Sequence, residues 1–408
     1  MNLAQIVKKR DWLLVDLPDV VFFQEGPGVR NNQYTTSGVK LLNVANLQDG
    51  RIVLDNTDRY ISEDEAYGRY QHFLVDEGDL IIASSGIKVE YFDKKMGFVE
   101  KHHLPLCLNT STIRFKSLDN SVLDIRYFMY FLKSNYFKKQ LSRLITGSAQ
   151  LNFGPSHLKK IKVILPDIYT QKRIVSILDK AQELIDKRKA QIEALDQLTQ
   201  SVFLEMFGDP VANKTWERRP LKDITDVRDG THDSPKYVPS GYPLVTSKNI
   251  KNGKIDLRNV NYISEEDFIN INKRSKVDIG DIIMPMIGTI GNPIIVDEQP
   301  NFAIKNVALI KFNNPCVINI YIKYLLNSHY LDYILNKNKR GGTQKFLSLT
   351  DIRNMEIPLP PRDLQAKFSE IVKKVDSQKA ILHKSLTELE NNFNSLMQRA
   401  FKGELFND

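Results

Sequence analysis

The sequence repeats itself, and this repeat constrains the fold more than any other feature of the chain. The segment RYISEDE (59–65) returns as NYISEED (261–267), and EGDLIIASSGI (77–87) returns as IGDIIMPMIGT (279–289). Both pairs lie 202 residues apart, and farther along the chain the shift settles at 194 residues without gaps. Such an ordered series of matches indicates a tandem duplication.

Each half has the same order of segments: short β-like runs broken by Gly, Pro and Asn, then a short helical pattern, then a long helix. Strand runs with one embedded helix, rather than strands alternating with helices, predict an α+β globule in each half. The short helical patterns cover residues 125–141 and 318–335. The β-like runs are residues 79–84, 111–116, 161–166, 281–286, 292–297 and 307–312.

The two closing segments are the clearest helices in the sequence. Residues 170–207 contain no Gly or Pro and stop at Gly208-Asp209-Pro210, and the second helix follows Pro360-Pro361. Apolar residues recur by sevens in both, which predicts that the two helices pack on each other as an antiparallel, coiled-coil-like pair. The alternative is that each helix lies separately on its own domain. The predicted seam consists of Ile174, Ala181, Leu195, Val202, Phe368, Val375, Leu382, Leu389 and Leu396.

These patterns predict four segments: a globular domain over 1–163, a central spacer helix over 164–208, a second globular domain over 209–357 and a C-terminal spacer helix over 358–408. The expected fold class is therefore α+β, with a tandem duplication of two globules separated by two long helices.

The positive charge lies in the globular halves. The chain has a net charge of +8, and each globular half carries +4, while the helices are nearly neutral. Two basic globules on a neutral spacer favour a polyanion bound at two places. A helix of this length is about 55 Å long, enough to hold two domains at half-sites spaced roughly 35 Å apart on DNA.

Motifs for several other functions are missing. The sequence has no GxxxxGK[ST] phosphate-binding loop, and Cys107 and Cys316, its only cysteines, cannot form a zinc knuckle. A nuclease-like pattern, Pro18-Asp19 with Asp93-Lys94-Lys95, has no counterpart in the second half. No apolar stretch is long enough to cross a bilayer and the N-terminus lacks a signal-peptide plan, so we expect a cytoplasmic protein without membrane contact. We expect neither catalytic residues nor a metal site.

Long polar side chains on loops are the best candidates to contact DNA, because Arg, Asn and Gln can bond two atoms of one base edge. Gln150 and Gln344 lie at matching places in Gly-rich loops, where a shared role in positioning the DNA backbone is expected. The candidates in the first half are Arg30, Asn32, Ser84, Lys88 and Gln150; those in the second are His232, Lys236, Lys248, Asn249, Gln344 and Lys345.

The order of these motifs resembles the specificity (S) subunit of Type I restriction-modification systems over essentially the whole chain. The resemblance rests on GSAQ (147–150) and GGTQ (341–344), and on LPDIYTQKRI (165–174) and LPPRDLQAKF (359–368), which open the long helices. It departs from the typical pattern at LPD, where LPP is usual.

The resemblance implies that each globule is a target-recognition domain that reads one half of a bipartite, asymmetric site on double-stranded DNA. The helices would set the gap and bind two adenine methyltransferase subunits, which carry S-adenosylmethionine. Motor-nuclease restriction subunits, which use ATP and magnesium, would join the complex, and this chain would hold no cofactor. Two alternatives stay open: a recognition module of a restriction enzyme with its own catalysis, and a coiled-coil scaffold that does not bind DNA.

Overall fold

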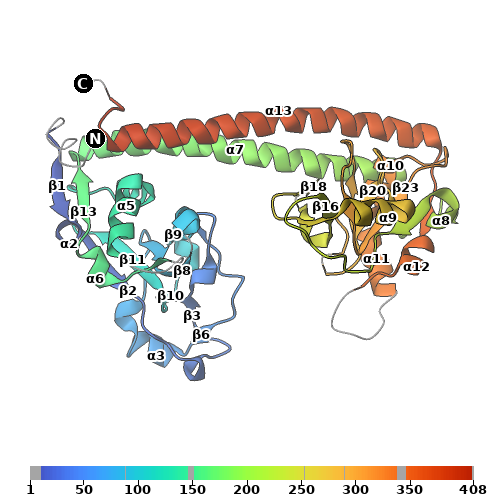
Figure 1. The fold of residues 1–408 in the computed structure, drawn as a ribbon. Coiled ribbons are helices and arrows are strands. Elements are labelled where there is room, and N and C mark those ends of the chain that lie inside the picture. The colour runs from blue at the N-terminus through green and yellow to red at the C-terminus, as the bar shows by residue number, and fades with distance from the viewer. Residues whose placement is uncertain are drawn as a thin grey trace. The chain divides into compact units, whose positions relative to one another are not determined.

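The computed structural model describes residues 11–87, 89–145, 151–251, 253–288, 290–337 and 346–406, and Figure 1 shows its fold. The chain divides into two compact units: unit 1 comprises Met1–Lys187 together with Leu386–Asp408, and unit 2 comprises Arg188–Ser385. The predicted tandem duplication is confirmed, since the same elements recur in the same order in both units.

Unit 1 is built around two sheets. The four-stranded sheet has the order β2-β11-β7-β9 and is antiparallel, while the three-stranded sheet has the order β10-β3-β6 with β10 and β3 parallel. The strands are β1 (Leu13–Asp16), β2 (Val21–Glu25), β3 (Val39–Leu42), β4 (Leu47–Gln48), β5 (Arg51–Ile52), β6 (Tyr60–Ile61), β7 (Leu80–Ala83), β8 (Ser85–Ile87), β9 (Met96–Phe98), β10 (Leu106–Leu108), β11 (Thr112–Ser117), β12 (Leu151–Asn152) and β13 (Lys162–Leu165). The helices are α2 (Leu17–Val20), α3 (Glu63–Tyr67), α4 (Ile125–Lys133), α5 (Asn135–Leu144), α6 (Pro155–Leu158) and α7 (Ile168–Phe207), with short 3-10 turns η1 (Asn31–Gln33), η2 (Val44–Asn46), η3 (Gln71–Phe73), η4 (Val89–Lys94) and η5 (Lys101–His103).

Unit 2 repeats this plan. Its four-stranded sheet has the order β15-β23-β20-β21, and its three-stranded sheet has the order β19-β16-β22 with β16 and β22 parallel. The strands are β14 (Arg218–Pro220), β15 (Asp226–Asp229), β16 (Tyr242–Val245), β17 (Ile250–Lys251), β18 (Lys254–Ile255), β19 (Asn261–Ile263), β20 (Ile282–Pro285), β21 (Ile294–Ile295), β22 (Ala303–Ile304), β23 (Val307–Lys311) and β24 (Glu356–Pro358). The helices are α8 (Leu221–Ile224), α9 (Glu265–Ser275), α10 (Asn319–Leu326), α11 (His329–Lys337), α12 (Leu349–Arg353) and α13 (Arg362–Phe401), with the 3-10 turn η6 (Ser247–Asn249).

The predicted β-like runs are confirmed as strands β7, β11, β13, β20, β21 and β23. Every residue of β7 and of β20 is buried, because each strand lies inside its sheet with both faces covered. This burial explains why these strands appear in the sequence as continuous apolar runs rather than alternating ones.

The short helical segments were expected to be single helices, and this is wrong. Each is broken into two, α4 and α5 in unit 1 and α10 and α11 in unit 2. Ser134 interrupts the first because its hydroxyl accepts a hydrogen bond from the backbone N–H of Phe137 (3.4 Å) and so caps a new helix. Ser328 does the same in unit 2 with the N–H of Tyr330 (3.2 Å).

The long helices lie within the predicted spacer segments 164–208 and 358–408. Helix α7 begins at Ile168 rather than residue 164, because Ile164 and Leu165 belong to β13. Helix α13 begins at Arg362 rather than residue 358 and ends at Phe401. The predicted stop after α7 is confirmed, since Gly208 adopts a positive φ of 75° that favours glycine at a helix end.

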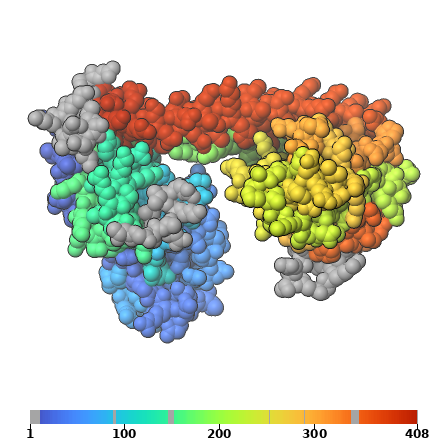
Figure 2. Space-filling view, in the orientation of Figure 1, coloured from blue at the N-terminus to red at the C-terminus, as the bar shows by residue number. Residues whose placement is uncertain are grey.

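Each long helix contributes to both compact units. In unit 1 the end of α13 packs on α4, where the Phe401 ring lies 5.4 Å from Tyr127 and 6.1 Å from Phe131 between centroids. Figure 2 shows this end of α13, in red, packed on the green part of unit 1. In unit 2 the matching residue at the end of α7, Phe207, lies 4.9 Å from Tyr321 of α10. The end of each helix therefore completes the core of the other half of the repeat.

The two long helices pack on each other in antiparallel fashion within each unit. In unit 1, Ile174 near the start of α7 shares a core with Ala400 near the end of α13. In unit 2, Phe203 near the end of α7 lies 5.5 Å from Phe368 near the start of α13, and Lys379 Nζ lies 2.5 Å from Asp196 Oδ1. These contacts exclude the alternative of two separate helices.

The predicted seam residues lie on the covered sides of the helices. Ile174, Phe368 and Val375 are buried, and the remaining six, namely Ala181, Leu195, Val202, Leu382, Leu389 and Leu396, are half-buried.

Candidate nucleic-acid interface

Three segments of unit 1 meet at the turn between β10 and β11. The loop after β2 contacts this turn through a hydrogen bond from the Gly26 N–H to the Thr112 carbonyl (2.9 Å). The segment after β7 contacts it through a hydrogen bond from the Ser84 N–H to the Ser111 carbonyl (2.8 Å). The Asn109 N–H donates to the last carbonyl of β3 (3.1 Å). The carboxyl ends of β2, β3 and β7 therefore open onto one edge of unit 1, which we call the loop edge.

Unit 2 builds the same loop edge around the turn between β22 and β23. The Gly230 N–H donates to the Val307 carbonyl (3.0 Å), and the Lys305 N–H donates to the last carbonyl of β16 (2.9 Å). The Asn306 N–H adds a bond to the Thr231 carbonyl (3.2 Å). Both units thus hold a matching set of loops through backbone bonds that do not depend on the exposed side chains.

Glycine is required where the loop after β2 in unit 1, and the matching loop after β15 in unit 2, crosses the turn. We call this loop the first loop of each unit. An ideal Cβ on Gly26 would lie 2.1 Å from the carbonyl oxygen of Asn109, and one on Gly230 would lie 2.4 Å from that of Ile304. Side chains cannot fit at these distances, so the matching glycines bring the two backbones together.

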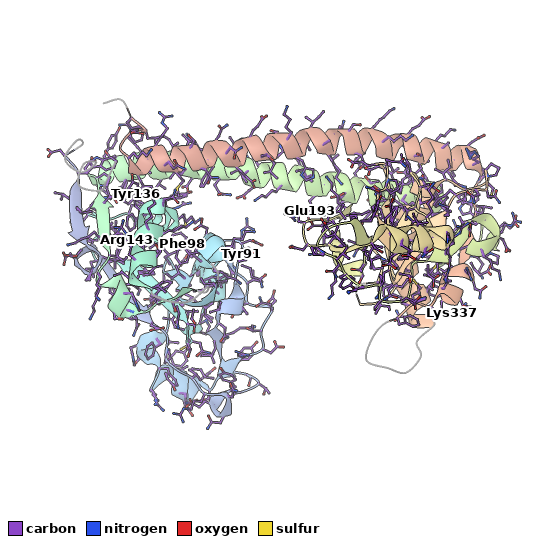
Figure 3. All side chains as sticks on the ribbon, viewed as in Figure 1. Tyr91, Phe98, Tyr136, Arg143, Glu193 and Lys337 are labelled. Atoms are coloured by element: carbon purple, nitrogen blue, oxygen red, sulfur yellow. The ribbon has the colours of Figure 1, made fainter. Side chains whose placement is uncertain are left out.

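The first loop of unit 1 presents Arg30 and Asn32 to solvent. Gln33 between them and the core anchors this loop: its Oε1 accepts the Arg30 N–H (3.0 Å), and its Nε2 donates to Glu65 Oε1 (2.8 Å). Arg30 and Asn32 are therefore free to project while their backbone is held. The segment after β7 adds Tyr91, a half-exposed aromatic side chain labelled in Figure 3.

Ser84 does not fit its expected role. It is fully buried behind the sheet edge, and its carbonyl accepts the Phe153 N–H (3.0 Å), so its hydroxyl cannot reach a DNA base. Ser84 is a core residue. Lys88, Gln150, Gln344 and Lys345 lie outside the described residues, and their predicted contacts stay predictions.

His232 lies on the loop edge of unit 2, but both of its ring nitrogens are engaged. Nε2 lies 2.7 Å from Asp229 Oδ2, and Nδ1 lies 2.9 Å from Asn306 Oδ1. The buried Asp229 carboxylate also pairs with Arg274. His232 is better described as a residue that fastens the loop to the β22–β23 turn than as one that reads a base. Lys236 on the same loop is exposed.

Lys248 is exposed at η6, whereas its neighbour Asn249 was wrongly taken for a base contact. Asn249 is buried, accepts the Thr246 N–H (3.0 Å) and donates to the Asp256 carbonyl (3.2 Å). Asn46 makes the same pattern of bonds in unit 1, with the Asn43 N–H (2.8 Å). The matched asparagines therefore hold a turn, which explains why the sequence repeats them.

Two polar side chains were missed by the sequence reasoning, the half-buried Lys305 and the exposed Thr110. Lys305, in the β22–β23 turn, extends its Nζ to Ser234 Oγ (2.6 Å) across the first loop of unit 2. Thr110 takes the matching place in unit 1, where its hydroxyl donates to the Pro27 carbonyl (3.1 Å). The signal that could have found them is their position two residues before the longest strand of each half, β11 or β23.

The repeated Gly-Asp pair lies at the other end of the sheet and has a structural role. Asp79 Oδ2 lies 3.6 Å from Arg114 Nη1, and Asp281 Oδ2 lies 2.5 Å from Lys311 Nζ, all four side chains being buried. Burial raises the pKa of Asp79 and of Asp281, although the neighbouring cations oppose this. These ion pairs fix the start of β7 and of β20, away from the loop edge.

The described residues hold no group of three or more His, Cys, Asp or Glu side chains that could bind a metal ion. Asp93 of the nuclease-like pattern pairs with Lys138 Nζ at 2.7 Å. Within the described ranges no helix is both long and apolar enough to span a membrane.

Comparison with known proteins gives a consistent match. The family model of the Type I restriction modification DNA specificity domain matches residues 9–195 and again 213–391. The MjaVIII specificity subunit of Methanocaldococcus jannaschii is 30% identical over 190 residues, which cover 45% of this chain and 43% of that protein. The EcoKI specificity subunit of Escherichia coli K12 is 23% identical over 396 residues, covering 90% of this chain and 82% of that protein.

The match to the MjaVIII subunit thus spans less than half of that protein's length. Among solved structures, a chain from a study of complex assembly and conformational transition in the type I R-M system has the same fold. Its TM-score is 0.58 at 18% identity, with 97% of this chain and 98% of that chain covered.

Proposed function

The chain belongs to the family of Type I restriction modification DNA specificity domains, and on that premise we propose that it is the DNA-reading specificity subunit of such a complex. The observation that carries this proposal is the duplicated loop edge. Two units hold matching loops on matching backbone bonds, yet they present different side chains to solvent. Such a scaffold suits the recognition of two different half-sites by one chain.

The exposed side chains of the loop edges favour DNA as the ligand. Arg30 in unit 1 and Lys236 and Lys248 in unit 2 are exposed cations on loops that start from the sheet edge. Cations on such loops attract the phosphate backbone, and loop side chains can then reach the base edges. The fixed backbone lowers the conformational entropy lost when the loops bind.

The helices fit the role of a spacer that sets the gap between half-sites. Helix α7 has 40 residues, which corresponds to about 60 Å. The end of each helix completes the core of the other half of the repeat. The helix length would therefore determine the distance between the two DNA-recognition domains.

Methyl transfer and cleavage would come from partner subunits. We propose that two adenine methyltransferase subunits, with S-adenosylmethionine, dock on the helices, and that motor-nuclease subunits using ATP and magnesium join them. Exposed apolar residues on α7, Leu184 in unit 1 and Leu198 in unit 2, support docking on the helices. This chain would itself hold no cofactor and perform no catalysis.

Methylation-site mapping tests the proposal. The chain is co-expressed with an adenine methyltransferase subunit of a Type I system, and methylated positions are determined in DNA of known sequence. A single bipartite site with a fixed gap is expected, together with binding that weakens steeply as salt is raised. Absence of any sequence-dependent methylation or DNA binding by the complex would favour the scaffold alternative, and turnover by the purified chain alone would favour an enzyme with its own catalysis.

A further inference from the structure

A pair of exposed apolar side chains stands on the loop edge of unit 2. Ile287, two residues after the end of β20, forms an isolated antiparallel bridge with Phe346, which precedes α12. Ile287 is 42% exposed and Phe346 is 54% exposed. Residues directly opposite each other on neighbouring strands place their side chains on the same face, so the two form one apolar patch.

The backbone fixes the outward direction of this patch. The next residues on either strand, Met286 and Leu347, are both buried and are joined by a hydrogen bond from the Leu347 N–H to the Met286 carbonyl (3.0 Å). Side chains alternate between the faces of a strand. With Met286 and Leu347 turned into the core, Ile287 and Phe346 must point outward.

Unit 1 has the matching bridge, but its two side chains are polar instead of apolar. Ser85 is paired with Asn152 at the matching register, and the buried neighbours Ser84 and Phe153 are joined by the matching backbone bond of 3.0 Å. Asn152 is exposed and Ser85 is half-exposed. The same backbone bridge, repeated in the two units, thus carries a hydroxyl and an amide side chain in unit 1 and two hydrocarbon side chains in unit 2.

The bridge lies where a nucleic acid is expected to bind. The loop after β20 lies on the loop edge, because Pro285 at the end of β20 pairs with Val307, the residue directly after the β22–β23 turn. The nine residues directly before Phe346 include Lys337, Lys339, Arg340 and Lys345 but no acidic residue. Lys337, the last residue of α11, is labelled in Figure 3. Apolar side chains beside a cationic stretch of sequence fit a ligand that has both phosphate and hydrocarbon groups.

We propose that the bridge is a specificity-determining element, in which Ile287 and Phe346 contact the 5-methyl group of a thymine in the major groove of one half-site. The inference rests on the proposed function of DNA recognition. Contact with apolar side chains, Phe among them, is how proteins distinguish the thymine methyl from the other groups of the major groove. The Ser85–Asn152 bridge would instead form hydrogen bonds with a base edge in the other half-site.

The test replaces each thymine of the mapped site, one at a time, by uracil, which lacks only the methyl group. DNA affinity is measured with the complex of this chain and its methyltransferase. At least one uracil in one half-site should weaken binding about fourfold, the factor expected for loss of one buried methyl group. Uracil without effect at every position overturns the inference, as does a site with no thymine in either half.

A double variant, Ile287→Ser with Phe346→Asn, copies the pair of unit 1 into unit 2. It should bind the thymine and uracil forms equally and tolerate other base pairs at that position. Ile269→Ser, which changes an exposed isoleucine of α9 in the same unit, should keep the uracil effect.

The uracil measurement uses the unchanged protein, so it decides the matter even if the double variant folds poorly. A double variant that keeps the uracil effect, or one that fails to bind the methyltransferase while folded, overturns the inference. Failure of the unchanged complex to bind any specific sequence would instead refute the proposed function.

Discussion

The side-chain oxygen of Gln365 accepts a hydrogen bond from the backbone N–H of Ile318 at 2.9 Å. Its amide nitrogen donates to the carbonyls of Cys316 (3.1 Å) and Pro360 (2.8 Å), and the side chain is fully buried. Gln171 makes the same bond to the N–H of Asp124 in unit 1, also at 2.9 Å. The repeated Pro-x-x-x-x-Gln motif therefore ties the start of each long helix to the segment that leads into α4 or α10.

Gln365→Ala should lower the stability of unit 2 by roughly 1–3 kcal/mol, because it leaves buried backbone groups without partners. The midpoint of denaturant unfolding measures the change. Gln197→Ala, at an exposed position of α7, serves as the control and should alter stability by less than about 0.5 kcal/mol. Equal midpoints for both variants would contradict the anchoring role.

The sequence was sufficient to predict the architecture because its signals are periodic or repeated. Heptads predicted the helix pair, and apolar runs predicted the buried strands. The same repeat misled the site assignment at Asn249, since a side chain that caps a turn recurs in both halves for structural reasons. The sequence did not reveal whether the Asn249 side chain is exposed to solvent or buried.

The burial of Ser84 could not be predicted from the sequence either. Its neighbours Ser85 and Gly86 are also small and polar, so the alternation that buries Ser84 and exposes Ser85 could not be derived from the letters alone. The loop edge itself depends on backbone bonds between β10, β3 and β7, which lie far apart in the chain. No local pattern predicts such contacts.

Leu195→Asp should lower stability by roughly 2 kcal/mol, because it places a carboxylate on the half-buried side of α7. Leu198→Asp is the matched control three residues away, where the leucine is 49% exposed. Thermal unfolding compares the two variants. A smaller loss for Leu195→Asp than for Leu198→Asp would mean that the seam has been placed on the wrong side of the helix. Leu389→Asp, at the half-buried seam position of α13 in unit 1, should behave like Leu195→Asp.

Phe401→Ala should destabilise unit 1 by about 3–5 kcal/mol, although the residue is more than 200 positions from most of that unit, because a buried aromatic ring is lost from its core. Hydrogen exchange should increase in α4 while unit 2 keeps its protection. Phe207→Ala, the matched change, should give the converse pattern with increased exchange in α10. Increased exchange in both units from either variant would contradict this division of the core.

Cys107 should resist alkylation in the folded protein. Burial raises the pKa of its thiol to about 12, and the thiolate is the reactive form. Iodoacetamide at pH 8 should leave Cys107 unmodified for hours and modify it within minutes in guanidinium, as mass spectrometry of peptides can measure. Rapid modification of the native protein would show that β10 opens readily.

Exchange of one globular domain should change one half-site only. Each unit carries its own loop edge on its own backbone bonds, so replacing residues 209–357 with the matching domain of a relative leaves the loops of unit 1 untouched. Methylation mapping of the complex should show the first half-site unchanged and the second replaced.

Insertion of four residues in each long helix should act differently, since they add about 6 Å, or nearly two base pairs at ~3.4 Å each. The half-sites should then keep their sequences while the gap between them grows. A domain exchange that alters both half-sites together would refute the model of two independent readers, and an insertion that alters a half-site sequence would show that the helices do more than set the gap.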